Sequence, residues 1–142
     1  MPSRSGNQQT GKVATAKRGR ADRRRPAEQS PKELALAIAD IGLDKKALNV
    51  EIIDVRDKSD YADFVVLMSG RSDRQVSAIA DHLLGQLARK HGARCMGVEG
   101  HSHGVWVLMD YGDVVVHVFH EDTRGYYDLE SLWIDAARVS VD

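Results

Sequence analysis

The fold is decided by the stretch 106-WVLMDYGDVVVHVF-119, which predicts one β-hairpin. Its turn is expected at Tyr111 and Gly112, because glycine supplies the positive φ that a tight two-residue turn needs. With Asp110 opposite Asp113 across this turn, the pairing of the two strands is set. Successive side chains of a strand point to opposite faces, so this pairing also assigns every side chain of the hairpin to one of two faces.

The two predicted faces of the hairpin differ in composition. One face is purely aliphatic and consists of Val105, Val107, Met109, Val114, Val116 and Val118. The other face is mixed and consists of Trp106, Leu108, Val115, His117 and Phe119, with Trp106 directly across from His117. Burial of six aliphatic side chains at ~1.5–3 kcal/mol each would supply a large share of a small domain's stabilisation. We therefore expect the aliphatic face in the core.

The mixed face has two interpretations. Its aromatic side chains, edged by Asp110, Tyr111 and Asp113, have the composition of a protein-binding patch, in which aromatic anchors are enriched. The alternative is that a second layer of helices covers this face too, as in many α/β domains. The sequence alone leaves both interpretations open.

Charge divides the 142-residue chain into two parts. Residues 1–29 carry eight Lys or Arg against two acidic residues, whereas residues 30–142 carry 12 basic and 19 acidic residues. The first part has almost no large apolar side chains, so we expect a disordered basic tail, 1–29, and a single domain, 30–142. Such a tail suits a weak contact to the phosphate backbone of ribosomal or other RNA, or serves only as a solubilising extension.

The composition of the domain argues against several classes of function. An excess of seven acidic residues favours a basic protein surface as partner and disfavours nucleic acid. No apolar run approaches the ~20 residues that cross a bilayer, so we expect a cytoplasmic protein without membrane contact. Cys95 is the only cysteine, which excludes an internal disulfide and a thiolate-rich metal site.

Periodicity and capping signals predict the other elements. A capping box at Ser30-Pro31-Lys32-Glu33 starts a helix that Gly42 can close. Ser72 and Gln75 start a longer helix that ends at Gly92. Further strands are expected at 50–56, 64–68 and 94–98, and a last helix at 123–133. The order predicts an α/β (α+β) single domain with a mixed five-stranded sheet flanked by helices.

Patterns that would carry chemistry are incomplete. His101-x-His103 and His117-x-x-His120 lack a further ligand at a spacing that completes a four-ligand site, so we expect no metal and no cofactor. Pairs of aspartates three residues apart lie on opposite faces of a strand and cannot hold magnesium together. Residues 70–72, at a helix start, are only a weak phosphate-binding signal. No catalytic residue is assigned, and a metal-dependent nucleotide-binding or nucleotidyltransferase enzyme remains the alternative function.

Aromatic rings beside carboxylates occur again near the end of the chain, at Tyr126, Tyr127 and Asp128. Aromatic rings supply buried area in an interface, and carboxylates meet Lys or Arg across it. The pairing therefore suits contact with a basic protein, although Tyr127 and Trp133 could equally fill the core.

Three blocks carry a resemblance to a known family: 60-DYADFVVLMSGRSDRQV-76, 106-WVLMDYGDVVVH-117 and 127-YDLESLW-133. In order and approximate spacing they closely resemble the ribosomal silencing factor family, also called the Iojap family. The resemblance covers nearly all of the domain and none of the tail. It implies a nucleotidyltransferase-like fold without the catalytic carboxylates of those enzymes, and therefore no enzymatic activity.

The same resemblance implies a function. It implies binding of the large ribosomal subunit through its protein uL14, which sterically blocks joining of the small subunit and represses translation under nutrient limitation. It also implies self-association as a homodimer. The residues that match the family's surface motifs are the predicted partner-binding residues: Trp106, Asp110, Tyr111, Asp113, His117, Tyr126, Tyr127 and Asp128.

Overall fold

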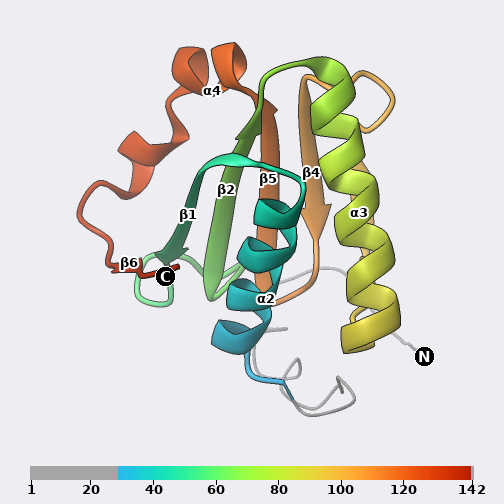
Figure 1. Cartoon of the computed structure of the whole chain (residues 1–142). Coiled ribbons are helices and arrows are strands. Elements are labelled where there is room, and N and C mark those ends of the chain that lie inside the picture. The colour runs from blue at the N-terminus through green and yellow to red at the C-terminus, as the bar shows by residue number, and fades with distance from the viewer. Residues whose placement is uncertain (1–28, 142) are drawn as a thin grey trace.

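The computed structural model describes residues 29–141, which form a six-stranded mixed sheet with helices on both faces (Figure 1). The strands lie in the order β3-β4-β5-β2-β1-β6. Along the chain the elements are α2 (Pro31–Asp44), β1 (Leu48–Asp54), β2 (Phe64–Gly70), α3 (Asp73–His91), β3 (Gly97–Glu99), β4 (Trp106–Asp110), β5 (Val114–His120), α4 (Glu121–Tyr127), the 3-10 helix η1 (Leu129–Trp133) and β6 (Arg138–Val139). Apart from Gln29, the predicted basic tail lies outside the described residues.

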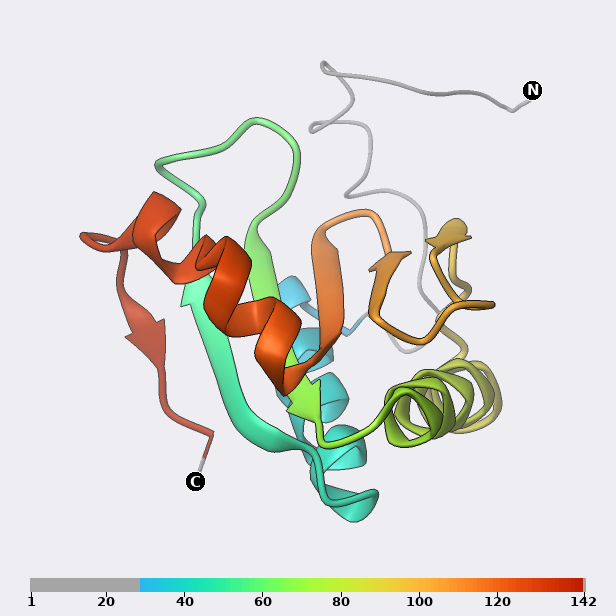
Figure 2. The ribbon, with the colours of Figure 1, turned by 90° about the horizontal axis from the view of Figure 1, so that it is seen from above.

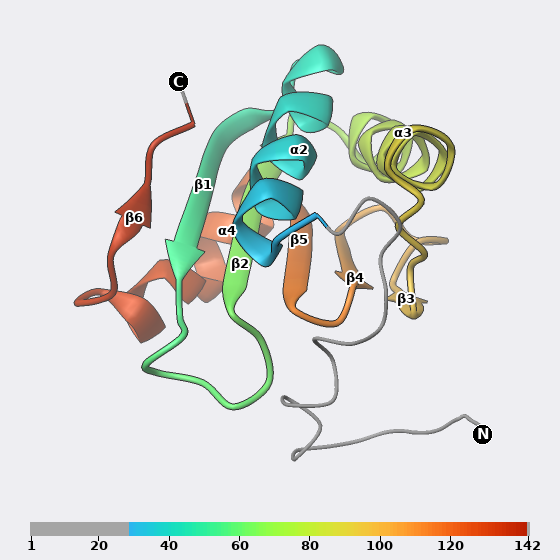
Figure 3. The same cartoon turned by 90° about the horizontal axis from the view of Figure 1, so that it is seen from below.

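Two layers of helix cover the sheet unequally. The long helices α2 and α3 lie side by side on one face, and α4 lies on the opposite face (Figure 2, Figure 3). The buried side chains accordingly form a large cluster on the α2–α3 side and a small one on the α4–η1 side. The helices that the structure describes include none with the length and apolar content to cross a membrane.

The predicted pairing within the hairpin is wrong, although the predicted faces are right. Trp106 pairs with Phe119 and Leu108 pairs with His117, whereas Trp106 was expected opposite His117. The true register differs by two residues, and a shift of two returns each side chain to the same face. The division into an aliphatic and a mixed face therefore survives the error.

The turn of the hairpin explains the difference in register. The turn is closed by the Tyr111 N–H, which donates to the Val114 carbonyl at 2.9 Å. Its two central residues are therefore Gly112 and Asp113, one position later than predicted. Gly112 has φ 87°, and glycine at the first central position is typical of a type II′ hairpin turn.

The aliphatic face of the hairpin packs into the core, as predicted. Five of its six members are fully buried on the α2–α3 side: Val107, Met109, Val114, Val116 and Val118. Val105 is the exception, with 39% of its surface exposed, because it precedes the first residue of β4. The hairpin thus anchors the sheet to both long helices.

The centre of the sheet is β2, every residue of which is buried. It pairs parallel with β5 and antiparallel with β1, and it confirms the strand predicted at 64–68. Burial on both faces of the sheet accounts for its unbroken apolar sequence from Phe64 to Met68.

Helix α2 starts as predicted and ends two residues later than predicted. Ser30 and Glu33 form the reciprocal capping box, with distances of 3.0 and 3.1 Å between backbone nitrogen and side-chain oxygen. Gly42 does not end the helix, which continues to Asp44. A Cβ at Gly42 would lie 2.6 Å from Met68 Sδ, so glycine here permits close packing of α2 on β2.

Helix α3 confirms its predicted ends. Ser72 Oγ accepts from the Gln75 N–H at 3.1 Å, and Gly92 ends the helix with φ 62°. Gln75 does not return the hydrogen bond to Ser72, because its Oε1 accepts from the Arg71 N–H at 2.6 Å. The amide of Gln75 also reaches the Lys45 carbonyl at 3.4 Å, which links α3 to the end of α2.

The prediction of five strands is wrong, because the sheet has six. The additional strand, β6, pairs antiparallel with β1 through Ile52 opposite Val139 and Ile53 opposite Arg138. A strand of two residues is too short to show alternation in the sequence. The observed bounds of β1, 48–54, and of β3, 97–99, also differ by a few residues from the predicted 50–56 and 94–98.

The single last helix predicted at 123–133 is two helices. The break lies at Asp128, which adopts φ 48° and ends α4. Its N–H donates to the Arg124 carbonyl at 2.8 Å, and its Oδ2 accepts from Ser131 Oγ at 2.5 Å. The left-handed residue redirects the chain, so that η1 crosses the mixed face of the sheet.

Candidate protein-binding site

Aromatic rings gather on the mixed face at the end of the sheet where α4 begins. Trp106, the first residue of β4, lies 5.1 Å from Phe119 and 4.9 Å from Tyr127, measured between ring centroids. Phe119 is fully buried, and the His117 ring stacks on it at 5.7 Å with an interplanar angle of 11°. Trp106 is half-buried, so part of this ring cluster is accessible from outside.

The Trp106 indole is oriented by His117. Trp106 Nε1 donates to His117 Nδ1 at 3.0 Å, which requires Nδ1 to be unprotonated. The neutral ring therefore carries its proton on Nε2. Burial lowers the pKa of His117 to about 4, so the acceptor form dominates at neutral pH.

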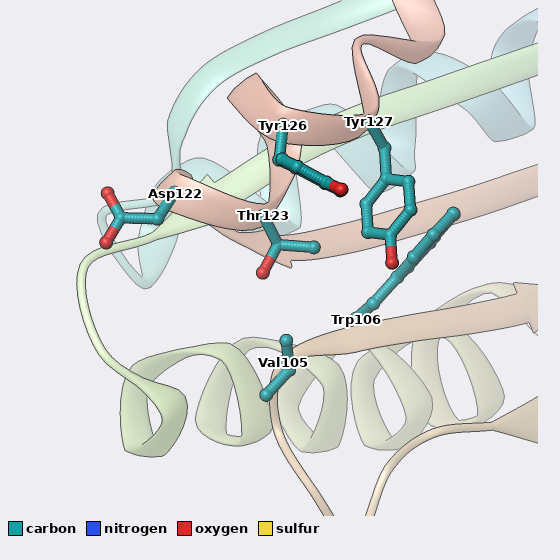
Figure 4. Close-up of a pocket in the computed structure, with 6 residues that line it drawn as sticks. All are labelled: Val105, Trp106, Asp122, Thr123, Tyr126 and Tyr127. Carbon is teal, nitrogen blue, oxygen red and sulfur yellow. The ribbon is translucent and has the colours of Figure 1, made fainter.

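An open hollow lies beside this cluster, between the start of β4 and helix α4 (Figure 4). It encloses about 560 Å³ and is lined by Val105, Trp106, Asp122, Thr123, Tyr126 and Tyr127. Tyr126 is 81% exposed and Tyr127 is 53% exposed. The structure thus combines both interpretations of the mixed face, because helices cover it in part and leave aromatic surface at one end.

Comparison with known proteins identifies the family. The family model described as "Ribosomal silencing factor during starvation" matches residues 28–142. The chain belongs to this family. The family is one of ribosome-associated factors that silence translation, and it is a regulatory family with no known enzyme activity.

Individual members of the ribosomal silencing factor family are similar over most of their length. The factor of Halalkalibacterium halodurans is 46% identical over 99 residues, which cover 70% of this chain and 84% of the relative. The factor of Bacillus subtilis is 42% identical over 115 residues, 81% of this chain and 94% of the relative. A crystal structure of a Chromobacterium violaceum protein superposes with a TM-score of 0.71 at 33% identity, covering 78% of this chain and 91% of that one.

The structure separates the predicted partner-binding residues of this chain into two groups. Trp106, Tyr126 and Tyr127 surround the hollow, whereas Asp110, Tyr111 and Asp113 lie at the hairpin turn, at the other end of β4. Four residue steps along a strand separate Trp106 from Asp110, roughly 13 Å. His117 lies between the groups, opposite Leu108.

The expectation that Tyr111 edges the mixed face is wrong. Tyr111 is 7% exposed and packs into the larger core with Met109, because residues two apart share a face. Burial and the neighbouring Cys95 raise the pKa of its phenol. The Tyr111 ring is therefore part of the core beneath α2 and α3.

Asp113 and Asp110 shape the hairpin turn. Asp113 is 7% exposed, and its carbonyl accepts from the backbone N–H groups of Asp63 and Phe64 at 2.7 and 3.2 Å. Asp110 is exposed, and its Oδ1 accepts from the Gly112 N–H at 2.8 Å. Of the three predicted residues at this end, Asp110 presents a carboxylate to the outside.

The residue that sequence reasoning missed is Arg124, which is 6% exposed. Its guanidinium donates to the Asn49 carbonyl at 2.5 Å and to Ser69 Oγ at 3.1 Å. It also pairs with Glu130 Oε2 at 2.8 Å and lies 3.8 Å from Glu51 Oε2. Arg124 thus ties α4 to β1, β2 and η1, and so fixes the wall of the hollow that carries Tyr126 and Tyr127.

The geometry does not support metal binding by the paired histidines or phosphate binding at residues 70–72. His101 places Nε2 2.6 Å from Asp81 Oδ1 on α3. Within residues 29–141 no three His, Cys, Asp or Glu side chains come together as a set of metal ligands. At the start of α3 the Arg71 and Gln75 N–H groups are already bonded to side chains of the same turn.

Proposed function

We propose that this chain represses translation under nutrient limitation by binding the large ribosomal subunit through its protein uL14. Bound there, it sterically blocks joining of the small subunit. The observation that supports this function best is the half-buried Trp106, held in place by His117 and continuous with exposed Tyr126 and Tyr127. Aromatic residues seated in this way are the usual anchors of protein interfaces.

Charge supports a protein partner that is basic. Residues 30–142 carry 12 basic and 19 acidic residues, which draw a basic surface by long-range attraction. Blocking subunit joining requires affinity and bulk, and no bond needs to be made or broken. We accordingly propose that the chain has no enzymatic activity and needs no cofactor.

The proposed contact surface has a centre and a margin. Trp106, Tyr126 and Tyr127 form its centre, and His117 acts by orienting Trp106. Asp110 lies at its margin as an exposed carboxylate, while Tyr111 and Asp113 support it through the hairpin turn. Asp128 supports the centre in the same way, since it sets where α4 ends.

Two further contacts belong to this proposal. Self-association as a homodimer would use the same aromatic surface, so that dimer formation and subunit binding compete. The basic tail, residues 1–29, would add a weak, salt-sensitive contact to ribosomal RNA phosphates.

The alternative, a metal-dependent nucleotide-binding enzyme or nucleotidyltransferase, gains no observation in its favour. Two of the backbone N–H groups at the start of α3, those of Arg71 and Gln75, are bonded to side chains of the same turn, as described above. Kinship of the fold with nucleotidyltransferases stays a prediction. Calorimetric titration with nucleotide and magnesium tests the enzyme alternative, and we expect no heat of binding.

Sedimentation with separated ribosomal subunits tests the proposed function. We expect the chain to travel with the large subunit and not with the small one, and to prevent their joining when added first. Trp106→Ala should weaken large-subunit binding by ~2 kcal/mol, about thirtyfold, because it removes the central anchor. Circular dichroism verifies that this variant is folded. Unchanged sedimentation of folded Trp106→Ala would contradict the placement of the site.

A further inference from the structure

The hollow beside Trp106 has an aromatic end and an acidic end (Figure 4). Trp106 and Tyr127 stand together at one end, and Asp122 lies at the other, with Tyr126 and Thr123 between them. The single charged side chain among the lining residues is Asp122. A ligand that lies along the hollow therefore contacts aromatic rings at one end and a carboxylate at the other.

The Asp122 carboxylate is open to a ligand. It is 91% exposed, and the nearest group that could carry positive charge is His120 Nδ1 at 3.8 Å. That nitrogen accepts from the Asp122 backbone N–H at 3.1 Å, so it has no proton to offer the carboxylate. Within the described part of the chain, Asp122 thus has no lysine or arginine partner.

Among residues 29–141, no cation lies over the rings at the aromatic end of the hollow. Tyr126 and Tyr127 meet edge to face, with centroids 4.9 Å apart and an interplanar angle of 89°. The faces of such rings attract cations. Arg124, on the same helix, is turned inward and fully engaged with Asn49 and Glu130.

We propose that the hollow receives an arginine side chain from the partner protein, whose guanidinium stacks on the exposed tyrosines and pairs with Asp122. Arginine suits this site because its planar, weakly hydrated guanidinium can stack on a ring and bind a carboxylate at once. Lysine offers only a compact, strongly hydrated charge. The inference rests on the proposed function in one respect: the arginine is taken to belong to a protein of the large subunit.

A peptide titration tests the hollow without the ribosome. The probe is Gly-Gly-Arg-Gly-Gly, added to nitrogen-15-labelled full chain while the indole N–H resonance of Trp106 is followed by NMR. The chain has two tryptophans, so Trp133 serves as internal reference. We expect a saturable shift with the arginine peptide, a weaker response with lysine in its place, and none with citrulline, the neutral analogue of arginine.

Two variants of the hollow have matched controls at the opposite end of the sheet. Asp122→Asn and Tyr126→Ala should each weaken peptide binding about tenfold. Asp60→Asn and Tyr61→Ala change the same residue types in the exposed loop between β1 and β2, and should leave binding unchanged. Equal shifts with citrulline and arginine, or no shift of the Trp106 resonance, would overturn the proposal.

Sedimentation of the same variants with large subunits separates this inference from the proposed function. We expect Asp122→Asn and Tyr126→Ala to weaken subunit binding about tenfold, and both controls to bind as the unaltered chain does. Equal binding of all four variants would overturn the arginine site and leave the proposed function intact. If the unaltered chain does not sediment with large subunits but its Trp106 resonance shifts with arginine, the proposed function fails and the cation site stands.

Discussion

The two faces of the sheet are closed in different ways. On the α2–α3 side, aliphatic side chains from the sheet meet those of two long helices, and almost all of them are fully buried. On the α4–η1 side the buried cluster is small, and partly buried side chains, Trp106 and Trp133 among them, pack around it. There a buried arginine replaces apolar packing as the main tie between helix and sheet.

The difference shows how a small domain divides stability from binding. A face closed by two long amphipathic helices yields stability and buries the aromatic rings of its core, Phe64 and Tyr111. A face crossed by a seven-residue helix and a five-residue 3-10 helix cannot cover every ring, so aromatic surface remains beside Trp106. The polar contacts of Arg124 hold these two short helices against the sheet, and they do so without covering the aromatic surface beside Trp106.

The largest effect is expected from a truncation on the closed face. Leu83→Ala, in the middle of α3, removes a fully buried side chain and leaves a cavity, which should lower the free energy of unfolding by about 4 kcal/mol. Urea denaturation measures this loss. Large-subunit binding by the folded fraction should not change, since Leu83 lies on the side away from the hollow. A loss of affinity in that fraction would break the proposed division between the faces.

A somewhat smaller effect is expected from the buried arginine. Arg124→Ala leaves the Glu130 carboxylate and the Asn49 carbonyl without their partner, and should cost about 3 kcal/mol of stability. It should also weaken large-subunit binding, because the helix that carries Tyr126 is released from the sheet. Urea denaturation and subunit sedimentation measure the two effects.

Arg124→Lys is the informative companion to that substitution. Lysine keeps the charge but cannot make all the contacts of the guanidinium, so partial recovery of both quantities is expected. If Arg124→Ala lost stability and kept full affinity, α4 would not depend on this tie.

The smallest effect is a pH dependence that belongs to the mixed face. The pKa of His117 is lowered to about 4 in the folded state, from 6.5 for a free side chain. Between these values the unfolded chain binds the proton more readily, so stability falls as pH drops from about 6.5 to 4 and changes little above 7. A change from pH 7 to pH 5 should lower the free energy of unfolding by about 2 kcal/mol through this group.

His117→Gln is the matched variant, because glutamine keeps an acceptor for the Trp106 N–H and does not titrate. Urea denaturation at both pH values should show a smaller loss for the variant than for the unaltered chain. An equal loss in the two proteins would place the titrating group elsewhere.

Elements determined by neighbours in the sequence were predictable. The capping box of Ser30 and Glu33, the C-terminal glycine of α3 and the aliphatic face of the hairpin all follow from residues a few positions apart. The register of the hairpin was missed by two residues because Tyr111-Gly112 and Gly112-Asp113 are both plausible central pairs. Which pair forms is decided by the packing of Tyr111 into the core.

The aromatic residues of the candidate site were predictable from the sequence, and the other residues that line the hollow were not. Aromatic side chains beside carboxylates are visible in the sequence, so Trp106, Tyr126 and Tyr127 were among the predicted partner-binding residues. Val105, Asp122 and Thr123 were missed, since they enter the site only where the start of β4 meets α4. Tyr111 was assigned to the wrong face because its place beyond the end of β4 obscured the alternation that buries it.

The sequence by itself determined the long helices, the central strands, the two faces of the hairpin and the family to which the chain belongs, because each depends on local order along the chain. Tertiary structure alone decided the sixth strand, the break at Asp128, the depth of Tyr111 and the role of Arg124. Arg124 binds Asn49 and Ser69, which lie 75 and 55 residues away. Contacts over such separations form only when the sheet brings distant segments together, and no local pattern records them.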